Sequence, residues 1–269
     1  MSQSISDPRN QYIAQQLRDA ETARQPIPPI HEQFAEPTVE AAYAVQRINT
    51  EFHWNNGRKI SGHKIGLTSA SVQRQLGVDQ PDFGVLWSDT EYQDGQIVPW
   101  SKLLQPKIEA EVGLILGRDL DAAVPTLADV VLATDCVVPA LEIVGSRIAQ
   151  WQIGICDTIA DNASSGVYVL GGPPRKLDGL DLRLCGMVIF RHGEPVSDGC
   201  GAACWGHPLS AAVWLARTLT HQGTPLRAGQ VVLTGALGPM VPVAPGDVFD
   251  AHIHGLGSVR AVIGIDDKP

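Results

Sequence analysis

The strongest constraint on the fold is the stretch Glu109-Ala110-Glu111-Val112-Gly113-Leu114-Ile115-Leu116, in which two acids open an otherwise apolar run. Side chains alternate between the two faces of a β-strand, so Glu109 and Glu111 are expected on one face and the apolar side chains on the other. Such a pair is common on solvated sheet faces, and a solvent-exposed strand is its ordinary interpretation. The pair alone does not distinguish a solvated face from a functional site.

A third acid lies inside a second apolar run. Glu142 belongs to Val137-Val138-Pro139-Ala140-Leu141-Glu142-Ile143-Val144, which is typical of a strand buried on both faces, where an acid is rare unless it is paired. A buried carboxylate without a partner is costly, and neighbouring carboxylates also repel each other. A hard divalent cation removes both problems. Glu109, Glu111 and Glu142 therefore form a candidate site for Mg²⁺ or Mn²⁺, with coordination positions left for water or substrate.

Composition limits the class of protein. The chain has 269 residues, of which 44% are hydrophobic, so it can bury a sizeable core. A net charge of -9 without a Lys/Arg cluster argues against a nucleic-acid partner. The N-terminus lacks a basic start and an apolar core, and no apolar run has transmembrane length, so we expect no membrane partner. The charge instead favours a small-molecule partner. Five cysteines without a Cys-x-x-Cys pair suggest reduced thiols and a cytoplasmic protein.

The spacing of apolar residues divides the chain into two regions. Residues 10–24 have helical spacing, and a second helix is expected to begin after Thr38 as its N-cap. Residues 1–60 are thus predicted to form a helical N-terminal region, and residues 61–269 a β-rich domain that carries the metal site. The latter also contains helices after a capping box at Thr126 and from Pro208 to Gln222. The expected strands cover residues 58–67, 109–116, 137–144, 166–170, 186–190, 231–234 and 248–253.

Two further ionisable residues are candidates for catalysis. Lys64 lies among small and apolar residues, so its amine could be partly buried and carry a proton or hold an anion. The ordinary alternative is a strand-end lysine that reaches solvent. Asp82 follows Gln80-Pro81 and precedes Phe83-Gly84, a turn signature in which an aspartate commonly caps the backbone.

Two other motifs give weaker indications of function. The loop Thr234-Gly235-Ala236-Leu237-Gly238-Pro239 lacks the pattern and the lysine of a nucleotide-binding loop, although its backbone could approach a small ligand closely. His252 and His254 alternate onto one strand face, as a metal-binding pair would. Because imidazoles suit zinc better than the oxygen ligands described above, we expect both histidines on the surface.

Six blocks occur in a fixed order over nearly the whole chain. They are Lys64-Ile65-Gly66-Leu67-Thr68, residues 75–84 (QLGVDQPDFG), Ile108-Glu109-Ala110-Glu111, Pro139-Ala140-Leu141-Glu142, residues 161–167 (DNASSGV) and residues 233–240 (LTGALGPM). In these blocks the chain resembles the 2-hydroxypenta-2,4-dienoate hydratases of aromatic meta-cleavage pathways, within the fumarylacetoacetate hydrolase superfamily. The loop that reads Thr-Gly-Thr-Pro-x-Gly in the wider superfamily appears here as Thr234-Gly235-Ala236-Leu237-Gly238, the form typical of hydratases rather than hydrolases.

The resemblance implies a fold and a set of site residues. It implies an α+β protein with a mixed β-roll or sandwich core and a helical N-terminal region, assembled as a homo-oligomer for which a decamer is a candidate. It assigns Mg²⁺ or Mn²⁺ to Glu109, Glu111 and Glu142, and proton transfer to Lys64 and Asp82. The residues that it places in the substrate pocket are Leu67, Thr68, Ser164 and Gly235.

The implied activity is a hydro-lyase reaction, in which water adds to 2-hydroxypenta-2,4-dienoate to give 4-hydroxy-2-oxopentanoate. One alternative is 4-oxalocrotonate (2-oxohex-3-enedioate) decarboxylase of the same pathway, which would need a second cation near the distal carboxylate. His63, Arg74 or Arg147 could supply it. Another alternative is a non-catalytic partner subunit that a metal stabilises. The pathway aldolase or decarboxylase is the candidate protein partner.

Overall fold

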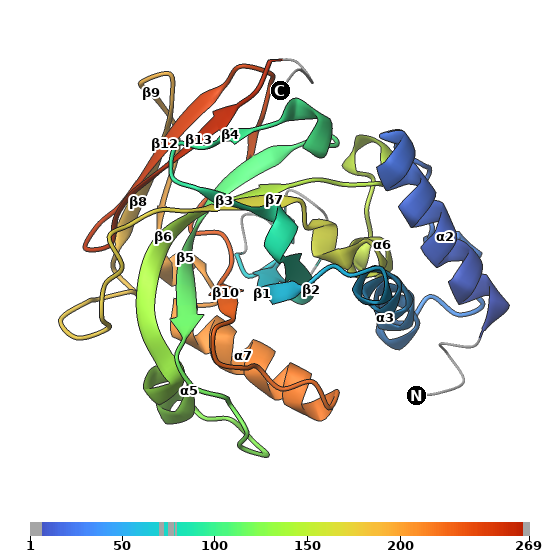
Figure 1. Ribbon diagram of the computed structural model, residues 1–269, viewed down its shortest axis with the longest axis horizontal. Coiled ribbons are helices and arrows are strands. Elements are labelled where there is room, and N and C mark those ends of the chain that lie inside the picture. The colour runs from blue at the N-terminus through green and yellow to red at the C-terminus, as the bar shows by residue number, and fades with distance from the viewer. Residues whose placement is uncertain (1–6, 70–72, 75–77, 79, 266–269) are drawn as a thin grey trace.

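Two β-sheets form the body of the protein. The structure is a computed structural model that describes residues 7–69, 73–74, 78 and 80–265. Within these residues the main sheet has eight strands, in the order β2-β1-β10-β5-β6-β7-β3, and β11 pairs with β5 beside this path. A second sheet has five strands in the order β4-β13-β12-β8-β9. Figure 1 shows this second sheet lying across the long, curved strands β5 and β6.

The main sheet is mixed. β1 pairs with β10 in parallel and with β2 antiparallel, whereas β5 and β6 form a long antiparallel pair. Most residues of that pair are buried, as expected of a strand pair with both faces covered. The strands of this sheet are β1 (Ile60–Gly66), β2 (Asp82–Trp87), β3 (Glu91–Gln93), β5 (Lys107–Leu116), β6 (Thr134–Val144), β7 (Val167–Leu170), β10 (Val231–Leu233) and β11 (Val241–Pro242).

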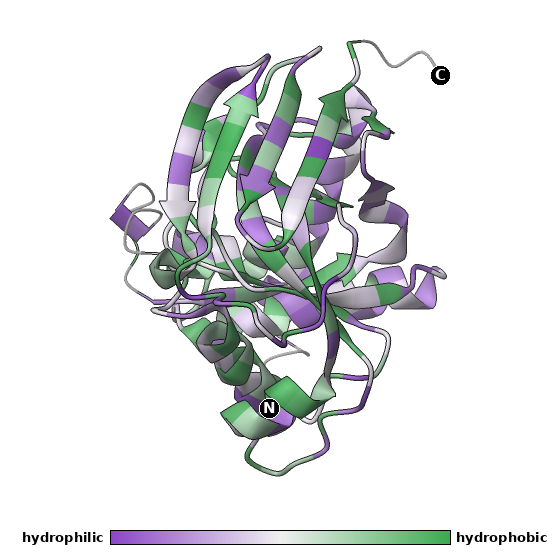
Figure 2. Cartoon of the chain, turned by 90° about the vertical axis from the view of Figure 1, so that its left-hand side faces the viewer, coloured by the Kyte–Doolittle hydropathy of each residue, from purple (hydrophilic) through white to green (hydrophobic). Residues whose placement is uncertain are grey.

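The second sheet covers one face of the main sheet. Its strands alternate between hydrophobic and hydrophilic residues, which Figure 2 shows along the sheet that faces the viewer. On β12, Phe249 and Ala251 are fully buried, whereas His252 is exposed. The buried face packs with Leu141 and Ile143 of β6 in one hydrophobic core. The strands are β4 (Ile97–Val98), β8 (Gly186–Arg191), β9 (Glu194–Cys200), β12 (Val248–Ile253) and β13 (Gly257–Ile263).

The helices form two groups. α2, α3 and α6 share a separate hydrophobic core that includes Ile13, Val45 and Ile159, and α5 packs against α7 at the other end of the molecule (Figure 1). The α-helices are α2 (Pro8–Ala23), α3 (Val39–Asn55), α5 (Leu127–Ala133), α6 (Ile155–Ala160) and α7 (Pro208–His221). Short 3-10 turns are η1 (His31–Gln33), η2 (Ser88–Thr90), η3 (Trp100–Lys102), η4 (Ala149–Trp151), η5 (Asn162–Ser164) and η6 (Gly201–Ala203).

The expected α+β class and helical N-terminal region are confirmed. Thr38 caps α3, and Thr126 forms the expected capping box with Asp129 at the start of α5. The expectation that Asp82 caps a turn was wrong, because this residue begins strand β2. The sequence reasoning also missed α6 and the strands β2, β3, β4, β9, β11 and β13.

The domain boundary after residue 60 stays a prediction. The two regions touch directly, since the buried Gln46 of α3 donates hydrogen bonds to the carbonyl oxygens of Phe83 in β2, at 2.8 Å, and Ile159 in α6, at 3.1 Å. Across the described ranges, no helix is both long and apolar enough to cross a membrane.

Candidate metal centre and active site

Three carboxylates meet on the face of the main sheet that lies opposite the second sheet. The antiparallel register of β5 and β6 pairs Glu109 with Glu142, and Glu111 lies two residues further along the same face of β5. The intervening residue Ala110 instead enters the core between the sheets. One oxygen from each glutamate lies within 4.8 Å of the others, and all three side chains are buried. The solvated-face interpretation of the acid pair is therefore excluded.

The electrostatics of this cluster favour a bound cation. Burial, followed by the charges of neighbouring glutamates, raises the pKa of Glu111 well above its ordinary value, and burial raises that of Glu142 to about 7 against the opposing effect of Lys64. Four buried oxygens accept no hydrogen bond from the described residues: Glu109 Oε2, Glu111 Oε1 and both carboxylate oxygens of Glu142. Unsatisfied oxygens on buried acids are the ligands that a hard divalent ion takes, so this donor set fits such a metal.

Lys64 lies beside the carboxylates. Its side chain, on β1, is only 2% exposed, and its Nζ donates a 2.8 Å hydrogen bond to the carbonyl oxygen of Ala163. The same nitrogen is 3.5 Å from Glu142 Oε2. Burial lowers the pKa of Lys64, but Glu142, Asp82 and the other carboxylates outweigh it and raise the pKa above its usual value. The expected alternative of a solvent-exposed lysine is therefore wrong, and the side chain is a buried ammonium.

Asp82 approaches the same region from β2. Its carboxylate is buried, its Oδ2 accepts a 2.9 Å hydrogen bond from Thr158 Oγ1, and its Oδ1 has no partner among the described residues. Burial raises the pKa of Asp82, although Lys64 and Thr158 oppose that rise. Gly66 leaves the necessary space, because a Cβ at this position would lie 2.1 Å from Asp82 Oδ1 and 3.3 Å from Lys64 Nζ. The carboxylate of Asp82 and the ammonium of Lys64 thus both lie next to Gly66.

Of the predicted substrate pocket, Gly235 contacts Glu111 and Thr68 lies beside Gly235. The backbone N–H of Gly235 donates a 2.6 Å hydrogen bond to Glu111 Oε2, and its φ of +109° is one that glycine adopts readily. A Cβ at Gly235 would lie 2.0 Å from Thr68 Oγ1, so the absence of a side chain lets the loop approach Thr68. The loop thus brings a backbone N–H to Glu111, and its expected approach to a small ligand stays a prediction.

The other two residues of the predicted pocket lie close by. Ser164 is buried, with its Oγ 3.4 Å from Thr158 Oγ1, so it lies on the Asp82 side of the site. Leu67 is buried in an apolar cluster with Val144 and Ala236. The pocket assignments themselves remain predictions.

The sequence reasoning missed Thr158 and the carbonyl group of Ala163. Thr158 lies on α6, a helix of six residues whose short apolar stretch has too few periods to be recognised. The role of Ala163 belongs to its backbone, so no side-chain pattern signals it. Only a three-dimensional arrangement could have identified either group.

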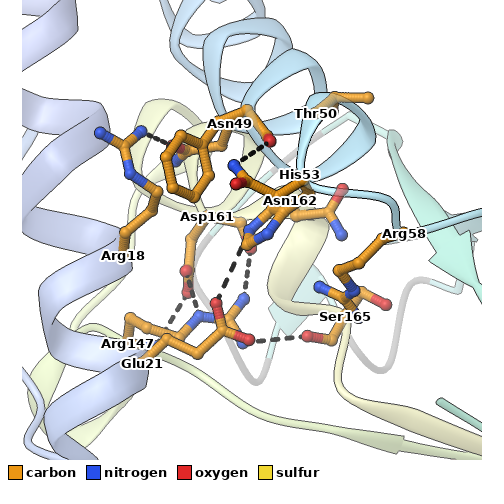
Figure 3. Close-up of polar contacts among 12 residues, drawn as sticks. Arg18, Glu21, Asn49, Thr50, His53, Arg58, Arg147, Asp161, Asn162 and Ser165 are labelled. Carbon is orange, nitrogen blue, oxygen red and sulfur yellow. Dashed lines mark hydrogen bonds and ion pairs between the residues drawn. The ribbon is translucent and has the colours of Figure 1, made fainter. Parts of the chain in front are cut away.

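The candidates for a second, substrate-binding cation do not join the cluster. His63 neighbours Lys64 on β1 and so points to the opposite face, and burial lowers its pKa to about 4, which leaves the ring neutral. Arg147 forms an ion pair with Asp161 and bonds the carbonyl oxygen of Ser165, as Figure 3 shows. Arg74 is exposed, and its neighbours 75–77 lie outside the described residues, as does Asp79.

Comparison with known proteins identifies the family of the chain. Residues 55–264 match the fumarylacetoacetate (FAA) hydrolase C-terminal family. The chain belongs to this family, whose members share the fold described above.

Similar proteins indicate which enzymes of this family the chain resembles in sequence and structure. The chain is 59% identical over 252 residues to the 2-keto-4-pentenoate hydratase of Paraburkholderia xenovorans, covering 94% of each chain, and equally to 2-keto-4-pentenoate hydratase 3 of Pseudomonas putida. A solved structure of 4-oxalocrotonate decarboxylase from Pseudomonas putida G7, complexed with magnesium and adipate, superimposes with a TM-score of 0.89 at 37% identity, covering 97% of each chain. The resemblance inferred from the sequence blocks is thus confirmed.

Proposed function

We propose that the protein is a hydro-lyase that adds water to 2-hydroxypenta-2,4-dienoate and releases 4-hydroxy-2-oxopentanoate. The observation that carries the proposal is the buried junction of a three-carboxylate cluster with the ammonium of Lys64, in a chain that is similar to hydratases over almost its full length. A metal site next to a buried proton carrier suits a 2-oxo acid substrate, whose carboxylate and 2-oxygen are both negatively charged or become so during reaction.

Glu109, Glu111 and Glu142 would hold the metal. Mg²⁺ and Mn²⁺ are the proposed ions because the ligand set consists of oxygen atoms only. When bound, such an ion stabilises negative charge on the substrate's oxygen atoms as a Lewis acid. The N–H of Gly235 orients one ligand, because it occupies one oxygen of Glu111 and leaves the other oxygen free to bind the ion.

Lys64 and Asp82 would move the protons. The dienol is protonated at C5 as its 2-hydroxyl group loses a proton. Water then adds at C4 and loses one proton as C3 gains one, so the net change is the addition of one water molecule. Lys64 carries a proton that its buried site retains, and Asp82 has one carboxylate oxygen without a partner among the described residues. Thr158 holds the other oxygen of Asp82 in place. Leu67, Thr68, Ser164 and Gly235 are the proposed walls of the substrate pocket.

The surroundings of the cluster favour a substrate with a single carboxylate. A decarboxylase acting on a dicarboxylic acid would need a cation for the distal carboxylate. Of the three candidates, His63 is neutral and on the opposite face, and Arg147 is occupied by Asp161. Arg74 is exposed at the edge of the described residues. The decarboxylase is nevertheless the second candidate, because a protein of that name superimposes on the chain with a TM-score of 0.89.

One assay separates these activities. The purified protein is mixed with the dienoate, and the loss of its ultraviolet absorbance is followed with Mg²⁺, with Mn²⁺ and after chelation. Carbon dioxide release from 2-oxohex-3-enedioate is measured in parallel. We expect metal-dependent hydration and little decarboxylation. Full activity in the chelated protein would contradict the metal site, and predominant carbon dioxide release would identify a decarboxylase. Inactivity on both substrates would support a non-catalytic subunit.

We also propose a homo-oligomer, with a decamer as the candidate size, that works in the cytoplasm and associates with the pathway aldolase or decarboxylase. Val124, Leu127 and Leu132, in and before α5, are 68%, 52% and 64% exposed, which is a high exposure for neighbouring large apolar residues. Their burial between subunits would remove this apolar surface from water. Sedimentation analysis tests the assembly, and a monomer at micromolar concentration would contradict it.

A further inference from the structure

The segment that contacts Lys64 has an unusual backbone. Asn162, Ala163 and Ser164 form the turn η5, and all three have positive φ angles, of 55°, 52° and 52°. Residues other than glycine rarely adopt this left-handed conformation, and runs of it are rarer because each Cβ approaches a carbonyl oxygen. Such strain persists only where surrounding contacts impose it, and it commonly marks a functional site.

The turn presents two groups to the active site. The carbonyl oxygen of Ala163 accepts the 2.8 Å hydrogen bond from Lys64 Nζ. The Oγ of the next residue, Ser164, lies 3.4 Å from Thr158 Oγ1, which in turn donates a hydrogen bond to Asp82. With right-handed backbone angles the carbonyl group of Ala163 would point in a different direction. The left-handed turn therefore determines where the ammonium of Lys64 is held relative to Glu142 and Asp82.

The side chain of Asn162 fixes this turn to β2. Its Oδ1 accepts from the backbone N–H of Val85 at 2.8 Å, and its Nδ2 donates to the carbonyl oxygen of Val85 at 2.9 Å. Gly84 makes room, because a Cβ there would lie 2.3 Å from the carbonyl oxygen of Asn162. Because β2 also carries Asp82, this two-point contact ties the acceptor of Lys64 to the strand that bears the second proton carrier.

Arg147 holds the two ends of the turn together. The guanidinium group of Arg147 donates to the carbonyl oxygen of Asp161 at 2.6 Å and to that of Ser165 at 2.9 Å, which are the residues on either side of the turn. It also forms an ion pair with the carboxylate of Asp161. Figure 3 shows Arg147, Asp161, Asn162 and Ser165 together in this arrangement.

We propose that Asn162 is a positioning residue for catalysis: by locking the left-handed turn to β2, it holds the carbonyl group of Ala163 where it fixes the ammonium of Lys64 beside Glu142 and Asp82. This inference rests on the proposed function for its catalytic part. The turn's effect on Lys64 is a separate statement that does not depend on the identity of the substrate. Asn162 lies outside the residues that the sequence assigned to the site.

The test uses Asn162→Gly, because glycine accepts the positive φ without strain and removes only the contact with Val85. We expect kcat for dienoate hydration to fall at least about tenfold, with KM and the Mg²⁺ dissociation constant within about threefold of wild type. Lys64, which is 2% exposed, should also become more reactive toward an amine-acylating reagent, as read by peptide mass spectrometry. Asn56→Gly is the matched control, since Asn56 Nδ2 also donates to a backbone carbonyl oxygen, that of Phe52, far from the site.

Unchanged kcat in folded Asn162→Gly protein would overturn the proposal, whether or not its melting temperature falls. Unchanged protection of Lys64 would overturn it as well. If wild-type protein does not hydrate the dienoate, the proposed function fails, but the labelling comparison still tests whether Asn162 holds Lys64. Should Asn162→Gly not fold, Asn162→Asp replaces it: the variant keeps the acceptor for the N–H of Val85 and places a second oxygen opposite its carbonyl group. An intermediate loss of kcat is then expected, and wild-type kcat would refute the idea.

Discussion

Replacement of Lys64 by methionine tests the centre of the proposed mechanism. Methionine keeps a long, flexible apolar stem but removes the ammonium, which lies 2.8 Å from the carbonyl oxygen of Ala163 and 3.5 Å from Glu142 Oε2. A divalent ion together with Lys64 balances the charges of Glu109, Glu111 and Glu142 when all are ionised. Without Lys64 the site keeps one net negative charge, to which an anionic substrate must then bind.

The size of the effect follows from the two roles of Lys64. Loss of a proton carrier typically lowers turnover by about 10²-fold to 10⁴-fold, which corresponds to about 3 to 5 kcal/mol in the activation barrier. The uncompensated negative charge should raise KM as well. Metal binding, by contrast, should not weaken, because Lys64 is a cation that competes for the charge of Glu142.

Dienoate absorbance measures turnover in this experiment, and titration calorimetry with Mg²⁺ measures metal affinity. Lys176→Met provides the control, because this lysine is 69% exposed and pairs only with the surface residue Asp135 among the described residues. Turnover of Lys64→Met within a few-fold of wild type would refute the assignment of Lys64 to proton transfer. A large loss of metal affinity would instead show that Lys64 supports the metal ligands.

Three further predictions concern the carboxylates and their surroundings. Glu111→Gln should make the metal-free protein more stable, since an amide replaces a buried acid, but should weaken Mg²⁺ binding at least about tenfold. Melting curves with and without metal test both effects, and unchanged Mg²⁺ binding would contradict the ligand role. Gly66→Ala should lower turnover at least about tenfold, because the new Cβ would lie 2.1 Å from Asp82 Oδ1, whereas Gly186→Ala, with no atom within 4 Å of its new Cβ, should not. Burial raises the pKa of Glu142 from 4.5 to about 7, so between these pH values the metal-free folded protein binds more protons than the unfolded chain. The metal-free protein should therefore lose on the order of 3 kcal/mol of stability as pH rises from 4.5 to 7. Denaturant unfolding at pH 5 and pH 7.5 measures this loss, and equal stability at the two values would contradict it.

Much of the site could be predicted because its residues lie in regular strands. The alternation of a β-strand places Glu109 and Glu111 on one face whatever the tertiary structure, and the apolar neighbours of Glu142 indicate burial. The register that sets Glu142 opposite Glu109 depends on a pairing of β5 with β6 that sequence patterns do not specify, so it was not predictable.

The missed elements have physical reasons. β3, β4 and β11 have two or three residues each, too few to show a period. Asp82 resembled a turn residue because proline precedes it, whereas the pairing of Asp82 with Gly66 draws it into the sheet. The left-handed turn at Asn162 was also invisible, since its conformation is imposed by Arg147 and Val85, which are distant in sequence or on another strand.

The layout of the main sheet also bears on how such enzymes can diversify. The three proposed metal ligands lie on the β5–β6 pair, whereas the two proposed proton carriers lie on β1–β2, and β10 separates the two pairs. Substitutions in β1, β2 or the turn that supports them can therefore alter proton delivery while the metal ligands stay in place. Under the proposed assignment, new reactions can arise through changes in the β1–β2 half alone, without rebuilding the anchor for the 2-oxo acid.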